Sequence, residues 1–185
     1  MVKVAAKPGT YLYPVPAVMV TCGPPDKPNI ITLAWVGTVC SEPPMVGISI
    51  RPSRYSHGLV KDQGEFALNL PTTDLVRELD YCGSVSGRKV DKFAATGLTP
   101  APAKAIETVI IAECPVNIEC KVEQILPLGT HDLFLGKIVA VQVNEDILDE
   151  QGDLDLTKAK PLIYGSHRYW SLGQLLATHG YSVKS

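Results

Sequence analysis

The sequence is divided into short apolar runs rich in β-branched residues, and proline- or glycine-containing segments such as GPPDKPN and SEPP separate them. Runs of this length, bounded by turn-forming residues, are typical of β-strands. In the longest run, residues from Cys114 to Val122 alternate between apolar and polar or turn-forming types, which is the period of a strand. The segment PLGTHD then predicts a hairpin turn. The expected strands are residues 17–21, 30–36, 45–50, 66–70, 108–126 and 133–143.

Helices are expected to be few and short. Cap-forming or terminating residues such as Ser53, Thr72 and Gly97 bound segments with a helical pattern. The expected helices are residues 54–62, 73–81, 91–96 and 171–178. The pattern predicts a mainly β fold, an antiparallel barrel with a few short helices on its rim. A chain of 185 residues with 45% hydrophobic content can bury one sizeable core, so we expect a single domain over residues 1–185.

The charge and the cysteines exclude several classes of protein. A net charge of -2 disfavours nucleic acid or an anionic membrane surface as the main partner. The N-terminal segment lacks a signal-peptide core, and no apolar run approaches the roughly 18 residues of a membrane helix, which predicts a cytoplasmic protein. Five cysteines without a CxxC pair predict reduced, mostly buried thiols and no metal site. The acidic segment 144–158 lacks the register of a calcium loop.

The segment ISIRPSRYSH, residues 48–57, has the pattern of an anion site. Ser49 and Arg51 fall on one face of a strand that Pro52 ends. Ser53 is then placed as the N-cap of a helix that continues through Arg54. A strand that ends at a helix N-terminus offers free N–H groups and guanidinium donors, which suit a phosphate. The alternative is that the arginines form surface salt bridges and the serine is only a cap.

Several ordered segments together carry a resemblance to a known family. Motifs for Rossmann dinucleotide sites, P-loops, zinc proteases and serine hydrolases are absent. The chain does contain, in order, NIITLAWVGTVCSEPPMVGISIRPSRYSH, GEFALNLP, SGRKVDKF, PVNIECKV, GTHDLFLGKI and PLIYGSHRYWSLG. This series resembles the flavin-reductase-like family of the FMN-binding split barrel, and within it the flavoredoxin type.

The resemblance implies a six-stranded antiparallel split barrel of the Greek-key type, with FMN in a groove near the interface of a homodimer. The residues implied to line the flavin ring and ribityl chain are Ala34, Trp35, Thr38, Ser49 and Ile50. Those implied to hold the phosphate are Arg51, Ser53, Arg54 and Ser56.

Lys92 and His131 are the implied catalytic residues. Lys92 would stabilise negative charge on the flavin ring. Its alternative is an ordinary surface lysine, and Arg88 and Lys89 compete for the same role. His131 would lie beside the ring, near a stacked nicotinamide, or would be a solvated turn residue. The family has GDH where this chain has GTH, and we expect Asp132 to replace the missing orienting partner.

Aromatic residues near the C-terminus allow two interpretations. Tyr164, Tyr169 and Trp170 either close over the flavin or pack in the dimer. The function that the resemblance favours is a flavin reductase-like oxidoreductase passing electrons from NAD(P)H through FMN to a small-molecule or protein acceptor. The alternative is a flavoredoxin-type electron carrier that receives electrons from a protein partner without nicotinamide turnover. A third hypothesis is a binding protein for another phosphorylated ligand.

Overall fold

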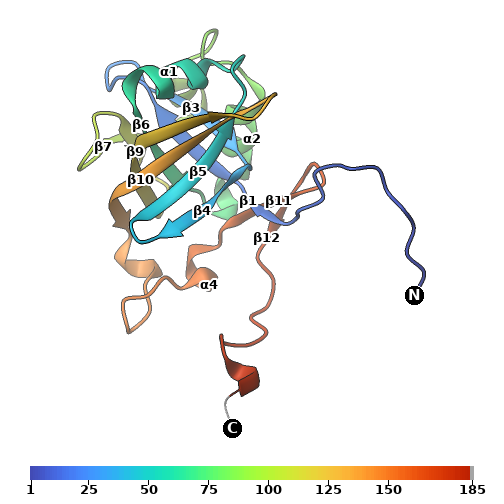
Figure 1. Cartoon of the computed structure of the whole chain (residues 1–185). Coiled ribbons are helices and arrows are strands. Elements are labelled where there is room, and N and C mark those ends of the chain that lie inside the picture. Colours follow the sequence, from blue (N-terminus) through green and yellow to red (C-terminus); the bar gives the residue numbers. More distant parts are fainter. Residues whose placement is uncertain (184–185) are drawn as a thin grey trace.

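The computed structural model describes residues 1–183 and is dominated by one curled antiparallel sheet (Figure 1). The strand order is β3-β2-β6-β9-β10-β5-β4. Their bounds are β2 Val18–Cys22, β3 Asn29–Leu33, β4 Val36–Ser41, β5 Pro44–Ile50, β6 Glu65–Leu70, β9 Val116–Pro127 and β10 Asp132–Val143. A bond from the Ser49 N–H to the Trp35 carbonyl, 3.0 Å long, joins the end of β5 to the β3–β4 turn. The prediction of a mainly β, antiparallel split barrel is confirmed.

The sheet has seven strands rather than the expected six, because β4 lies almost wholly outside the predicted strand runs. The run 30–36 divides at Ala34 and Trp35, so that β3 ends at Leu33 and β4 begins at Val36. The run 108–126 also divides, into β8 (Val109–Ile111) and β9. The second break includes Pro115, which has no N–H to donate to a strand ladder. β8 instead pairs with β7 (Pro100–Pro102) outside the main sheet.

The core lies inside the curl of the sheet. On β5, Val46, Ile48 and Ile50 are buried, as the predicted alternation requires, and they share a core cluster with Phe66 and Phe134. Gly136 on β10 makes room for that core, because a Cβ there would lie 2.6 Å from Phe66 Cζ. Ser49 lies on the opposite face of β5 and is only partly buried, so it is available to line a binding site.

Three helices follow the predicted segments with corrected starts. α1 (Tyr55–Gln63) is followed by Gly64, and α3 (Lys92–Thr96) is followed by Gly97. Each of these C-cap glycines has a left-handed backbone conformation, which ends the helix. α2 (Val76–Ser84) follows the short η1 helix, Thr73–Leu75. The prediction of Ser53 as the N-cap of α1 is wrong, because Arg54 is the extended flanking residue and makes no side-chain cap bond. Short helical turns η2 (Glu145–Ile147), α4 (Leu156–Ala159) and η3 (Tyr181–Val183) occur towards the C-terminus.

A small second sheet connects the barrel to both chain ends. β1 (Val15–Pro16) pairs with β11 (Leu162–Gly165), which pairs with β12 (Arg168–Ser171). Beyond this sheet the N-terminal segment and the segment after β12 run away from the barrel (Figure 1). The predicted helix 171–178 is wrong, since residues 172–178 have no regular structure. Leu175 and Leu176 are 77% and 93% exposed, and a short amphipathic helix without a packing surface is marginal in water.

The thiols agree with the sequence prediction. All five cysteines are free, and four of them are buried while Cys40 is partly exposed. Burial raises the pKa of the Cys22 and Cys82 thiols to about 11 and that of Cys120 to about 12. Within residues 1–183, no helix is long and apolar enough to cross a membrane, and no group of three or more His, Cys, Asp or Glu side chains is arranged to hold a metal ion.

Candidate functional site

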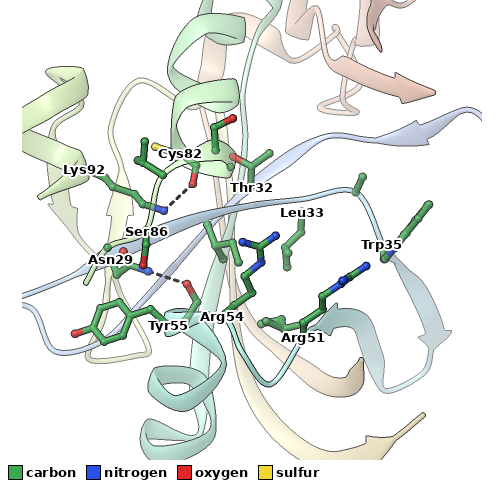
Figure 2. A pocket seen from close by; sticks show the side chains of 18 of the residues that line it. Asn29, Thr32, Leu33, Trp35, Arg51, Arg54, Tyr55, Cys82, Ser86 and Lys92 are labelled. Atoms are coloured by element: carbon green, nitrogen blue, oxygen red, sulfur yellow. Dashed lines mark hydrogen bonds between the residues drawn. The ribbon is translucent and has the colours of Figure 1, made fainter. Parts of the chain in front are cut away.

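A cavity of about 650 Å³ opens beside the polar face of β5 (Figure 2). The β3–β4 turn, the end of β5 and the start of α1 form one part of its lining. The α2–α3 loop, the tip of the β9–β10 hairpin and the β11–β12 hairpin form the rest. This volume falls in the range of about 300–1,000 Å³ typical of small-molecule and cofactor sites.

The cavity gathers the predicted site residues, with one exception. The predicted residues that line it are Ala34, Trp35, Ser49, Ile50, Arg51, Ser53, Arg54, Ser56, Lys92 and His131. Thr38 instead lies exposed on β4, paired with Val46 on β5, outside the lining. β4 turns away at the break after Leu33, which carries Thr38 away from the site.

The strand-to-helix junction supplies a positively charged wall, which we call the α1 wall and which comprises residues 49–56. Ser49 lies on the polar face of β5, Arg51 follows the last residue of that strand, and Arg54 stands directly before α1. Figure 2 shows both guanidinium groups extending into the cavity. The N-terminus of α1 adds a positive dipole end. The combination favours an anionic group at this wall.

The floor of the cavity contains a buried polar pair. Asn29 Nδ2 donates to Ser56 Oγ at 2.7 Å, and both residues are almost fully buried (Figure 2). The bond fixes the first turn of α1 against the start of β3. Sequence reasoning missed Asn29, although a polar residue that follows Pro28 and begins an apolar run was an available signal.

Lys92 is not a surface residue. It is 4% exposed, and its Nζ donates to the carbonyl oxygens of Ile30 and Cys82, each at 2.6 Å. An ammonium group has three donors, so these bonds leave one for the cavity that Lys92 lines. Burial lowers the pKa of Lys92, and the nearby Arg54 lowers it further. The competing Arg88 and Lys89 are both exposed, so Lys92 is the cation of this segment that lines the cavity.

His131 is held by Thr130 and Arg51. Its Nδ1 lies 2.9 Å from Thr130 Oγ1, and Arg51 Nε donates to its Nε2 at 3.4 Å. Because Nε2 accepts, neutral His131 carries its proton on Nδ1 and donates to the threonine. Partial burial lowers the pKa of His131, and the Arg51 and Arg54 charges lower it further. The prediction that Asp132 orients His131 is wrong, because Asp132 pairs with His57 at 2.8 Å.

Two aromatic residues of the lining, Tyr164 and Tyr169, come from β11 and β12, and we call this part of the lining the hairpin wall. Tyr169 Oη donates to Asp80 Oδ1 of α2 at 2.9 Å. Burial and the Asp80 carboxylate raise the pKa of Tyr169 to about 12. Trp170 lies outside the lining and is 53% exposed. Sequence reasoning missed Asp80, since nothing local marks it.

The charged groups of the lining are mainly basic. Arg51, Arg54 and Lys92 carry positive charge, while Asp80 is the one acidic residue of the lining and is bonded to Tyr169. A cavity with this balance, an apolar Ile50 side and an aromatic wall suits a planar ligand with an anionic tail.

Comparison with known proteins places this arrangement in a family. The model of the flavin reductase like domain matches residues 10–173. The chain belongs to the flavin reductase-like family. Its structure is similar to the flavoredoxin of Desulfovibrio vulgaris (Miyazaki F), with 33% identity, a TM-score of 0.92 and coverage of 99% of this chain and 100% of that one.

Two other solved structures are also similar to this flavin reductase-like domain. The flavoredoxin of Methanosarcina acetivorans is 31% identical, with a TM-score of 0.92, covering 100% of this chain and 98% of that one. An FMN-binding protein of Thermus thermophilus with bound 1-cyclohex-2-enone is 28% identical, with a TM-score of 0.82, covering 96% of this chain and 100% of that one. The predicted resemblance is thereby confirmed over nearly the whole chain.

Proposed function

We propose that this flavin reductase-like domain binds FMN, with the phosphate at the α1 wall. The observation that carries the proposal is the junction of β5 and α1, which directs Arg51, Arg54 and the α1 N-terminus at one cavity. Ala34 and Trp35 of the β3–β4 turn, which line the same cavity, would hold the flavin ring. Similarity to two flavoredoxins and to an FMN-binding protein supports this choice over another phosphorylated ligand.

The proposed reaction passes electrons from NAD(P)H through FMN to a small-molecule or protein acceptor. Bound FMN supplies the hydride- and electron-accepting chemistry. Lys92 presents its remaining N–H from a buried position, where a fixed cation stabilises developing negative charge. Neutral His131 borders the cavity mouth, where it helps to shape the space for a nicotinamide.

A second candidate function is a flavoredoxin-type electron carrier fed by a protein partner. It is favoured by the similarity to two flavoredoxins over almost the full length of both chains. The two candidates share the cofactor and the cavity, and they differ only in the electron donor.

We also propose that the protein acts as a cytoplasmic homodimer. On the outer side of β10, Val139, Val141 and Val143 are 37%, 50% and 39% exposed in an unbroken alternation. The chain ends add Leu12 and Leu176, 86% and 93% exposed. A second copy would remove these apolar groups from water. Sedimentation equilibrium at micromolar concentration tests this, and a stable FMN-loaded monomer contradicts it.

Anaerobic mixing of the FMN-loaded protein with NADH and with NADPH tests the electron donor. Rapid loss of the visible flavin absorbance is expected for the reductase. Absorbance that persists until a reduced carrier protein is added favours the electron carrier. A colourless protein that cannot be reconstituted with FMN contradicts both candidates.

A further inference from the structure

The last residue of α2 and the loop that follows it form one edge of the cavity, and we call residues 84–89 the strap. The strap residues that line the cavity are Ser84, Val85, Ser86 and Gly87. A turn closed by the Lys89 N–H and the Ser86 carbonyl, 3.0 Å apart, follows them. This turn places the Arg88 side chain against the start of α1.

Arg88 fastens the strap to the residues on both sides of Arg54. Its Nη1 donates to the Ser53 carbonyl oxygen at 3.4 Å, and its guanidinium carbon lies 5.4 Å from the centre of the Tyr55 ring. A cation over an aromatic face adds attraction to the hydrogen bond. The two contacts form a latch across the cavity edge, beside the wall where the phosphate is proposed to lie.

The strap also lies tightly on the cavity floor. A Cβ at Gly87 would lie 1.9 Å from Asn29 Oδ1 and 3.1 Å from Tyr55 Cδ1. Asn29 is itself held by Ser56, and Figure 2 shows Asn29, Ser86 and Tyr55 together on one side of Arg54. Strap, floor and α1 are therefore in close contact at this edge of the cavity.

We propose that the Arg88 latch restricts the flavin to a mononucleotide. This inference rests on the proposed placement of the FMN phosphate at Arg54. FMN ends at that phosphate and fits with the strap in place. FAD continues into a second phosphate and an adenosine, so it requires the strap to lift from Ser53 and Tyr55. The free energy of lifting lowers the apparent affinity for FAD, because only the open fraction of the protein can bind it.

Equilibrium titration of flavin-free protein with FMN, FAD and riboflavin tests the latch. In Arg88→Ala the affinity for FAD should rise about tenfold, which is about 1.4 kcal/mol at 25 °C, while the affinity for FMN changes less than about twofold. Lys89→Ala is the matched control, because it removes the same charge from the adjacent exposed position. Its ratio of FAD to FMN affinity should equal that of the wild type.

A second variant tests whether the stacking contact is the cause. Tyr55→Leu removes the ring beneath Arg88. If both variants act through this one contact, the double variant should change the ratio of FAD to FMN affinity by less than the sum of the two single changes. An unchanged ratio in Arg88→Ala, or an equal shift in Lys89→Ala, overturns the role of Arg88 alone. Wild-type protein that binds riboflavin as tightly as FMN instead contradicts the phosphate placement, and the latch proposal falls with it.

Discussion

The two walls of the cavity differ in chemistry and in how the chain builds them. The α1 wall consists of residues 49–56, a single strand-turn-helix segment with two arginines. The hairpin wall depends on Tyr169 and Asp80, which are 89 positions apart and meet only in the folded protein. A wall made from adjacent residues can be inferred from sequence spacing, whereas a wall made from distant residues cannot. The difference also separates anion binding from ring binding, and each can be tested by itself.

The largest effect is expected for Lys92, which lines the cavity and bonds to β3 and α2. Lys92→Met leaves the carbonyl oxygens of Ile30 and Cys82 without their donor, at a cost of about 1–3 kcal/mol for each buried group. We therefore expect the free energy of unfolding to fall by about 2–6 kcal/mol in urea titration. Lys89→Met is the control, because Lys89 is an exposed lysine of the same segment. The free energy of unfolding of this variant should be close to that of the wild type.

The same Lys92→Met variant reports on the flavin. The two-electron potential should fall by some tens of millivolts, since about 30 mV corresponds to 1.4 kcal/mol. Affinity for oxidised FMN should remain nearly constant, because its ring carries no charge to lose. Spectroelectrochemical titration measures the change. An unaltered potential would mean that Lys92 has only its structural role.

The α1 wall should distinguish FMN from riboflavin. Arg54→Ala should weaken FMN binding by about 1.5–3 kcal/mol, the range for hydrogen bonds to charged groups, and leave riboflavin affinity nearly unchanged. Lys61→Ala, at the far end of α1, is the control for loss of charge on the same helix. Equal losses for FMN and riboflavin in Arg54→Ala would show that the phosphate lies elsewhere.

The ring-binding residues should not make that distinction. Trp35→Leu should weaken FMN and riboflavin equally, by about 0.5–1.5 kcal/mol, the range for aromatic contacts beyond their buried area. Fluorescence titration with both ligands measures the losses. A loss confined to FMN would place the phosphate near Trp35 and reverse the assignment of the two ends.

The smallest effect concerns His131 and pH. Its pKa in the folded protein lies below the ordinary value of 6.5, so the folded state binds this proton more weakly than the unfolded chain. Stability should therefore fall as the pH decreases through 6.5 towards the lowered pKa. His131→Asn should lose less stability over the same window in urea titrations. Stability curves of the two proteins that stay parallel across this range would contradict the lowered pKa.

The sequence predicted most of the fold and the charged wall because their signals are local. Strand alternation placed Val46, Ile48 and Ile50 in the core, and glycine placed the ends of α1 and α3. The prediction of a helix at 171–178 was wrong because a short helix with an apolar face needs another part of the protein to pack against that face. Within residues 1–183, no segment covers the leucines of this region.

The rest of the site could not be predicted because it depends on contacts between distant residues. Asp132 follows His131 in sequence, yet β10 turns its carboxylate to His57 on α1. Lys92 has the pattern of a surface lysine, and the packing of α3 against β3 and α2 buries it. Thr38 belonged to a matching segment, but the break between β3 and β4 removes it from the cavity.

The concentration of cations in the cavity has a kinetic consequence. Arg51, Arg54 and Lys92 lie together on a chain whose net charge is -2, so their field is local to the mouth of the cavity. Such a field raises the encounter rate with an anion and is weakened by salt, with a Debye length of about 8 Å at physiological ionic strength. Newly synthesised protein should therefore bind FMN with a higher association rate than riboflavin, which has no phosphate. The difference between the two association rates should decrease as the ionic strength rises.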